Sequence, residues 1–165
     1  MIRNIIGRII HKLVFILPGG STLRPFLHRL RGVKIGKNVW ISQDVYIDEL
    51  HPDFVTIGDN STIGRRTSIF THFYWGTRQS KYNKGHVVIE KDVFIGPHCV
   101  ILPNVRIGQG SVIKAGTIVT RDVPSHTFWG LPSPGPLGHV TVPLTSHNSY
   151  EAFLAGLKPI RRKKT

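Results

Sequence analysis

The sequence predicts an all-β protein built as a parallel β-helix, in which short strands stack into a three-sided prism. A hydrophobic residue returns every six positions, and the fifth position of each group of six is small or β-branched. Neither an α-helix of 3.6 residues per turn nor a single strand of period two keeps such a spacing in phase. The first positions are Ile89, Ile95, Ile101, Ile107, Ile113 and Val119, and the fifth positions are Val93, Cys99, Val105, Ser111, Thr117 and Val123.

The same spacing occurs earlier in the chain, so the predicted prism covers residues 33–132. Six further groups begin at Ile35, Ile41, Ile47, Ile57, Ile63 and Ile69, with a slip of four residues after the third. Twelve groups of six correspond to about four coils of three sides each. Each first-position side chain is expected to point into a narrow core, and Gly96 and Gly108 to relieve the corners.

Residues 1–32 are predicted to form two helices before the prism. The first, up to Leu17, is basic and amphipathic and ends at Pro18-Gly19-Gly20. It is too short and too charged to span a bilayer, and it lacks the features of a signal peptide. Two interpretations remain open: an interfacial anchor on an anionic leaflet, or a helix that packs on the prism or on a neighbouring subunit.

The second predicted helix follows Ser21 or Thr22 as its cap and stops at Gly32. Its face of Leu23, Phe26, Leu27 and Leu30 is expected to cover the first coil, whose strand edges would otherwise stay unpaired. The tail, residues 133–165, is predicted to contain an extended segment and a short helix capped by Ser149.

The chain is strongly basic, with a formal net charge of +13, and no acidic residue precedes Asp44. This charge predicts a polyanionic partner such as anionic lipid, a phosphorylated cofactor or an acidic glycan. Nucleic acid is not predicted, because no recognition motif accompanies the charge. The single cysteine, Cys99, falls on an inward position, which favours a core residue over a nucleophile.

Ile89 follows Ile69 by twenty positions, where an offset of six would continue the pattern. About fourteen residues, 75–88, are therefore expected to leave the prism as a loop. Long loops in compact domains are usually functional or disordered. His72 stands just before this loop, and as the fourth residue of its group it should point outward.

These segments resemble the hexapeptide-repeat acyltransferases with a left-handed parallel β-helix, in the branch of xenobiotic, galactoside and polysaccharide O-acetyltransferases. The similarity is carried by VIEKDVFIGPHCVILPNVRIG, by KAGTIVTRDVP and by THFYW before the loop. The resemblance implies left-handedness, acetyl-coenzyme A as co-substrate without a metal, and a homotrimer in which the loop helps to enclose a site between subunits.

The resemblance also implies roles for individual residues. His72 matches the general base, for which imidazole is suited by its pKa near neutrality; the alternative is a surface histidine in a turn. Ala115 and Gly116 would contact the pantetheine arm of coenzyme A through their backbone, and Thr120 and Arg121 would lie near its nucleotide end. Tyr74, Trp75 and His86 are assigned to acceptor binding. Pro97 departs from the family, because it lacks the N–H expected to face the thioester oxygen.

The predicted function is acetyl-coenzyme A-dependent O-acetylation of a sugar hydroxyl, in surface polysaccharide or lipid-linked glycan synthesis. The expected location is cytoplasmic, with peripheral contact to the inner face of the membrane. The alternatives are an acetyltransferase for a small soluble acceptor, a non-catalytic assembly module, or a zinc site that uses His72 and His98.

The six-residue register predicts that Ile95→Asp or Ile107→Asp prevents folding. Each buried first-position aliphatic side chain contributes roughly 1.5 to 3 kcal/mol, and a carboxylate in its place would be buried without a partner. Expression followed by circular dichroism measures this directly. A soluble, folded product from either variant would contradict the register.

Overall fold

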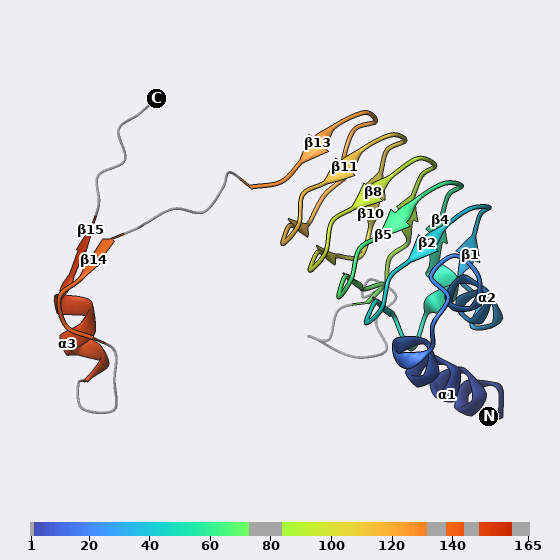
Figure 1. Ribbon diagram of the computed structural model, residues 1–165, viewed down its shortest axis with the longest axis horizontal. Coiled ribbons are helices and arrows are strands. Elements are labelled where there is room, and N and C mark those ends of the chain that lie inside the picture. Colours follow the sequence, from blue (N-terminus) through green and yellow to red (C-terminus); the bar gives the residue numbers. More distant parts are fainter. Residues whose placement is uncertain (1, 73–83, 132–137, 144–148, 160–165) are drawn as a thin grey trace. The chain divides into compact units, whose positions relative to one another are not determined.

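The computed structural model describes residues 2–72, 84–131, 138–143 and 149–159. The chain divides into two compact units, one up to Leu131 and one from Pro132 onward, and each is described by itself. Figure 1 shows the first unit as a stack of coils with two helices beside its first coil.

The first unit is the predicted left-handed parallel β-helix, and its strands form three sheets in which all pairs are parallel. The first sheet contains β1 (Lys34–Ile35), β4 (Val55–Ile57), β7 (Val87–Ile89) and β10 (Val105–Ile107). The second contains β2 (Trp40–Ile41), β5 (Thr62–Ile63), β8 (Phe94–Ile95), β11 (Val112–Ile113) and β13 (Phe128–Trp129). The third contains β3 (Tyr46–Ile47), β6 (Ser68–Ile69), β9 (Val100–Ile101) and β12 (Ile118–Val119).

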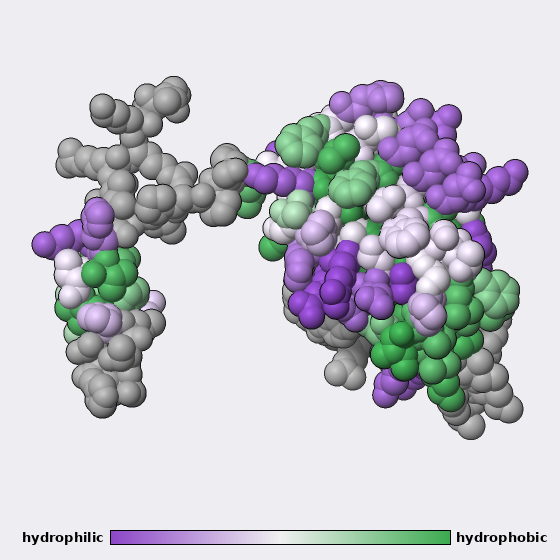
Figure 2. All heavy atoms as spheres, viewed as in Figure 1, coloured by the Kyte–Doolittle hydropathy of each residue, from purple (hydrophilic) through white to green (hydrophobic). Residues whose placement is uncertain are grey.

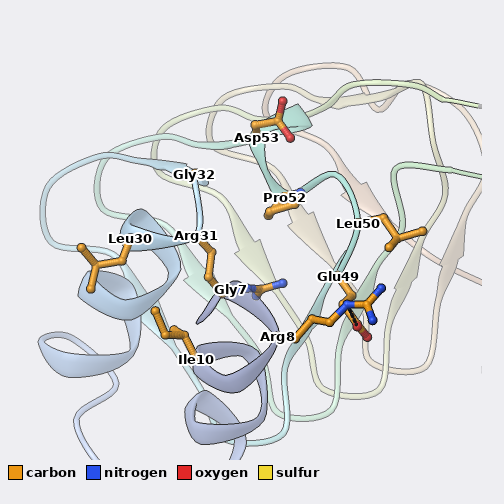
Figure 3. A pocket seen from close by; sticks show the side chains of 10 residues that line it. All are labelled: Gly7, Arg8, Ile10, Leu30, Arg31, Gly32, Glu49, Leu50, Pro52 and Asp53. Atoms are coloured by element: carbon orange, nitrogen blue, oxygen red, sulfur yellow. Dashed lines mark ion pairs between the residues drawn. The ribbon is translucent and has the colours of Figure 1, made fainter. Parts of the chain in front are cut away.

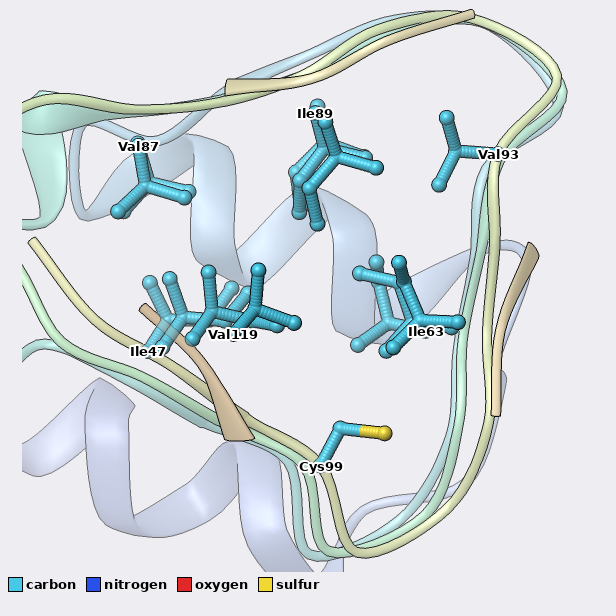
Figure 4. Close-up of a cluster of buried hydrophobic side chains, with 14 of the residues drawn as sticks. Ile47, Ile63, Val87, Ile89, Val93, Cys99 and Val119 are labelled. Atoms are coloured by element: carbon cyan, nitrogen blue, oxygen red, sulfur yellow. The ribbon is translucent and has the colours of Figure 1, made fainter. Parts of the chain in front are cut away.

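The pairing register places each first-position residue directly on the equivalent residue of the next coil. In the second sheet, for example, Ile41 pairs with Ile63, Ile63 with Ile95, and Ile95 with Ile113. These side chains are fully buried and form columns inside the prism, as Figure 4 shows for part of the core. The predicted register is therefore confirmed.

Gly96 and Gly108 relieve crowding at the corners, as expected, because a Cβ atom on either would approach the backbone of the next coil too closely. A Cβ atom on Gly96 would lie 2.6 Å from the backbone nitrogen of Ala115, so glycine is needed there for close approach of the next coil. The left-handed backbone conformation of the corners is adopted mostly by other residues, many of them Asn or Asp, which tolerate it best after glycine. These residues are Asn38, Asp44, Asn60, Arg66, Asp92, His98, Asn104 and His126.

Three boundaries differ from the prediction. The strand β13 begins a fifth coil, whereas four coils were expected. Val87 and Val88 belong to β7, because β4, β7 and β10 each have a third residue whose side chain is also buried. A bridge between His72 and Lys84 closes the base of the excursion, which is therefore shorter than 75–88.

The predicted four-residue slip after Ile47 contains a 3₁₀ turn, η1 (Pro52–Phe54).

The two N-terminal helices are α1 (Ile2–Ile16) and α2 (Leu23–Leu30). Thr22 is the N-cap of α2, but its side chain makes no capping hydrogen bond. The predicted apolar inner face of α2 is wrong. Its buried residues are Arg24, Pro25 and His28, whereas Phe26 and Leu30 are 53% and 59% exposed.

Hydrogen bonding between the coils explains why α2 buries polar residues and exposes apolar ones. In each later coil the first-position carbonyl accepts an N–H from the coil before it, as Ile63 does from Ser42. The first coil has no coil before it, so its three equivalent carbonyls need other donors. Arginines of the α2 segment supply them, one for each side of the prism: Arg29 Nε to Ile35 O at 3.1 Å, Arg24 Nε to Ile41 O at 2.8 Å and Arg31 Nη2 to Ile47 O at 3.0 Å.

Each of the two N-terminal helices contains a buried histidine, His11 in α1 and His28 in α2. Burial and the charge of Arg31 lower the pKa of His28 to about 3, and the same causes lower the pKa of His11 to about 4. Both rings are therefore neutral near pH 7. This neutrality allows His28 Nδ1 to accept a hydrogen bond from Arg31 Nη1 at 3.1 Å.

The second unit contains β14 (Gly138–Val140), α3 (Tyr150–Ala155) and β15 (Leu157–Pro159). Ser149 caps α3 as predicted, since its hydroxyl accepts the Ala152 N–H at 3.1 Å. The antiparallel pairing of β14 with β15 was not predicted. Among the helices that the structure describes, none has the length and hydrophobicity that crossing a membrane requires.

The arginine cap predicts a stability order for alanine variants. Arg31→Ala removes buried donors to Ile47 and Asp48 and should lower the free energy of unfolding by roughly 1 to 3 kcal/mol. Arg29→Ala removes solvent-exposed hydrogen bonds and should cost less. Denaturant titration of both variants tests this, and equal losses would contradict the buried cap.

Candidate functional site

The candidate site lies at the edge where the chain passes from the third sheet to the first, here called the third edge. Within the first two coils this edge carries both irregular insertions, the turn around η1 and the excursion that follows His72. Asp48 begins the first insertion, directly after β3, and His72 begins the second, three residues after β6. The pairing of β3 with β6 brings these two positions together.

Asp48 is fully buried, and its carboxylate accepts four hydrogen bonds. Oδ1 accepts the backbone N–H groups of Leu50 at 2.9 Å and His51 at 3.1 Å. Oδ2 accepts the Thr71 N–H at 2.9 Å and lies 2.6 Å from His72 Nδ1. Burial alone would raise the pKa of Asp48, but the hydrogen bonds from Thr71 and His51 and the charge of His72 hold it below its usual value. Asp48 is therefore an anion near neutral pH.

His72 is only 9% exposed in the single chain, although it is not one of the core residues from which its side chain was expected to point away. The ring lies outside the aliphatic core, against Asp48, because this carboxylate is buried at the corner and takes the ring nitrogen as its fourth donor. With Nδ1–H directed at the carboxylate, Nε2 is the nitrogen that can take up a proton. The arrangement is a histidine whose ring is held in one orientation by a buried carboxylate.

Aromatic rings continue from His72 along the third edge. The His51 ring meets the His72 ring edge-on at 6.0 Å, Phe54 lies 5.5 Å from His51, and His86 stacks on Phe54 at 4.4 Å. The rings of His51 and Phe54 therefore lie between His86 and His72, and these two histidines do not stack on each other. Tyr74 and Trp75 lie outside the described residues.

The residues expected to bind coenzyme A fall on two different edges. Thr120 and Arg121 follow β12 on the third edge, and the Arg121 guanidinium lies 5.4 Å from the centre of the Trp129 ring. Ala115 and Gly116 are exposed on the edge between the second and third sheets, here called the second edge. The Gly116 N–H donates to Pro97 O at 2.9 Å, and its φ of +72° suits glycine. One chain thus does not bring Ala115 and Gly116 together with His72.

A cavity of about 290 Å³ lies beside this site, between the two helices and the turn that carries His51 (Figure 3). Arg31, Leu50, Pro52 and Asp53 are among its lining residues. An ion pair of 3.1 Å joins Arg8 to Glu49 in its wall. His72 does not line this cavity, so a slot for a thioester beside His72 stays a prediction.

Two other sequence-based hypotheses concern metal binding and Cys99. No group of three metal-ligating side chains occurs within residues 2–72, 84–131, 138–143 and 149–159. His98 lies on the second edge, away from the third-edge His72. Cys99 is a core residue as predicted: burial raises the pKa of its thiol, which donates to Lys114 O at 3.2 Å.

Sequence reasoning missed Asp48 and His51. The available signal was the four-residue slip after Ile47, because a break in an otherwise regular repeat marks an irregular corner. An acid at the start of that break, one coil before His72, is the residue that the stacking brings beside the histidine.

Comparison with known proteins supports the fold. The sequence pattern of the family described as bacterial transferase hexapeptide (six repeats) matches residues 86–121. The Bacillus subtilis protein YvoF, named as an acetyltransferase, is 39% identical over 98 residues, which cover 59% of this chain and 55% of YvoF. The chain thus matches about half the length of such relatives.

Two solved structures show the same fold. One is a hexapeptide-repeat acetyltransferase of Vibrio cholerae complexed with acetyl-coenzyme A, with a TM-score of 0.59 and 24% identity over 75% of this chain and 79% of that one. The other is a galactoside acetyltransferase in complex with coenzyme A, with a TM-score of 0.54 and 24% identity over 74% of this chain and 73% of that one.

The geometry predicts the effect of Asp48→Asn on the His72 tautomer. An amide can donate to Nδ1, which would move the ring proton to Nε2 and remove the preferred orientation. Nitrogen NMR shifts of the His72 ring near neutral pH measure the tautomer. We expect protonated Nδ1 in the parent protein and protonated Nε2 in the variant; protonated Nε2 in both would contradict the Asp48 hydrogen bond.

Proposed function

We propose that this chain, whose repeats match the bacterial transferase hexapeptide pattern over residues 86–121, transfers an acetyl group from acetyl-coenzyme A to a hydroxyl group of a sugar. The observation that carries the proposal is the buried Asp48 carboxylate, 2.6 Å from His72 Nδ1. This contact leaves Nε2 as the basic nitrogen of a fixed imidazole, which is what a general base requires.

The proposed reaction has His72 Nε2 take the proton of the acceptor hydroxyl as its oxygen attacks the thioester carbonyl. Asp48 holds Nδ1–H in place and stabilises the imidazolium that forms. The tetrahedral intermediate then collapses, the carbon–sulfur bond breaks, and the coenzyme A thiolate leaves with the proton that His72 returns. Each turnover yields the acetyl ester and free coenzyme A.

Stabilisation of the intermediate must use a donor other than residue 97. Pro97 has no N–H, and its carbonyl can only accept a hydrogen bond, as it does from the N–H of Gly116. An oxyanion without a donor from this corner would be less well stabilised than in relatives that carry an N–H there.

We infer that the complete site needs two copies of the chain, arranged in a homotrimer. Gly116 and Thr120 lie on either side of strand β12, which places the second and third edges on opposite sides of the third sheet. A pantetheine arm on the second edge of one subunit can reach a third-edge His72 only if that histidine belongs to a neighbour. Parallel prisms placed side by side provide this juxtaposition.

A sugar is the acceptor that best suits the third edge. His51, Phe54 and His86 present a series of rings, and aromatic rings offer the flat apolar faces on which sugar rings stack. The galactoside acetyltransferase with the same fold is named for such an acceptor. We place the enzyme on the cytoplasmic side, where it would act in surface polysaccharide or lipid-linked glycan synthesis; a small soluble acceptor is the second candidate.

Replacing His72 with alanine should lower turnover by roughly 10² to 10⁴ fold, because it removes the general base. Thiol release from acetyl-coenzyme A in the presence of a panel of sugars measures the rate. His139→Ala, in the second unit, is the matched control and should retain full activity. Undiminished turnover by the His72 variant would remove this residue from the mechanism.

Mixed assemblies test the shared site. His72→Ala removes the base on the third edge, and Ala115→Trp blocks the exposed backbone on the second edge. Each variant alone should be inactive, but subunits refolded together should regain part of the activity, since some sites then combine two intact edges. No recovery from assemblies shown to be mixed would contradict a site between subunits.

A further inference from the structure

An exposed apolar surface covers the helical end of the β-helix. It consists of five large side chains on α1 and α2, here called the helical-end surface, with exposed fractions between 39% and 73%. Figure 2 shows hydrophobic side chains gathered over this end of the first unit. The five residues are Ile9, Leu13, Ile16, Phe26 and Leu30.

The arginine cap accounts for this exposure. The inward face of α2 is occupied by Arg24 and His28, with Arg31 just beyond its end, because the first coil needs hydrogen-bond donors there. Phe26 and Leu30 are consequently turned away from the protein. On α1, His11 and Val14 face the protein and Ile9, Leu13 and Ile16 do not. Exposed apolar residues that form such a group mark an interaction site rather than scattered surface residues.

The same end of the chain is uniformly basic. Residues 1–43 contain eight lysines and arginines and no acidic residue. Arg8 pairs with Glu49, but in the described parts of the chain no carboxylate lies within ion-pair distance of Lys12, Arg29 or Lys34. Exposed apolar side chains flanked by lysine and arginine are typical of helices that lie in the interface of an anionic bilayer.

We propose that the helical-end surface docks the protein on an anionic lipid bilayer. The apolar side chains of α1 and α2 enter the headgroup region, and Lys12 and Lys34 contact lipid phosphates. A second copy of the chain fits this surface poorly, because two such ends would bring like charges together. A soluble acidic protein or glycan would neutralise the charge but would leave the five apolar side chains without a partner.

Docking bears on the acceptor, and this consequence alone rests on the proposed function. Asp48 and His72 belong to the first and second coils, and coils are spaced by about 5 Å, so the pair lies within about 10 Å of the coil that α2 caps. The acceptor hydroxyl reached from a docked protein would belong to a sugar carried by a membrane lipid.

Vesicle flotation of the full chain tests the docking. The parent protein should float with phosphatidylcholine vesicles that contain phosphatidylglycerol and should stay unbound with phosphatidylcholine alone. Phe26→Ser combined with Leu30→Ser should weaken binding by at least about tenfold, since two exposed apolar side chains no longer enter the interface. Lys12→Glu should weaken binding by more than about fivefold, because it replaces an attractive charge with a repulsive one.

Matched controls separate docking from general hydrophobicity and charge. Phe94→Ser with Val112→Ser changes exposed apolar residues on the second sheet, and Lys91→Glu changes an exposed lysine in the third coil. Both controls should bind vesicles like the parent protein. Failure of the parent protein to float, or equal loss in controls and helical-end variants, would overturn the proposal. So would a helical-end variant that changes oligomer size but not flotation. Acetyl transfer to a soluble sugar, measured on the same variants, reports separately on the proposed function.

Discussion

The hydrogen bonds between successive coils constrain everything else in this protein. Each coil donates N–H groups to the first-position carbonyls of the coil that follows, and this direction is the same on all three sides. The ladder therefore leaves a row of carbonyls without donors at its start. A buried carbonyl without a donor costs free energy, so the fold needs a cap with three donors in a triangle. Arg24, Arg29 and Arg31 provide it from one short helical segment.

The candidate site arises from the same requirement at a corner. Where the chain inserts extra residues after β3 and β6, backbone N–H groups leave the regular ladder and must find other acceptors. Asp48 supplies those acceptors for Leu50, His51 and Thr71, and the oxygen that binds Thr71 also binds His72. The Asp48 carboxylate thus accepts hydrogen bonds from the backbone of the two insertions and also fixes the orientation of the His72 imidazole. The irregular corner and the proposed general base therefore depend on the same carboxylate.

The sequence predicted the strands, because they are marked by a residue type that repeats. It did not predict contacts between individual pairs of residues that are distant in the chain. The sixfold spacing predicted every strand from β1 to β12, because a first-position isoleucine fits only the inside of the prism. It did not predict that Arg24 and Arg31 would be buried, since the carbonyls they bind become visible only once the first coil is placed. Asp48 was missed for a similar reason: its partner lies one coil away, and the spacing between them depends on the length of an insertion.

The arginine cap and the corner that carries Asp48 and His72 lie near the same end of the β-helix, which links the proposed bilayer docking with the proposed acetyl transfer. By turning arginines inward, the cap leaves apolar side chains for a bilayer, and the coils nearest that end carry Asp48 and His72. The remaining coils extend the edges on which a coenzyme would lie. The expected cofactor residues are divided between two edges, and from this division we infer a site that is shared with a neighbouring subunit.

A crystal structure of the protein with a non-transferable analogue of acetyl-coenzyme A tests this account most directly. The account predicts that the thioester mimic lies between His72 Nε2 of one subunit and the Ala115–Gly116 corner of another. An analogue held by both groups of the same chain, or bound far from His72, would contradict it.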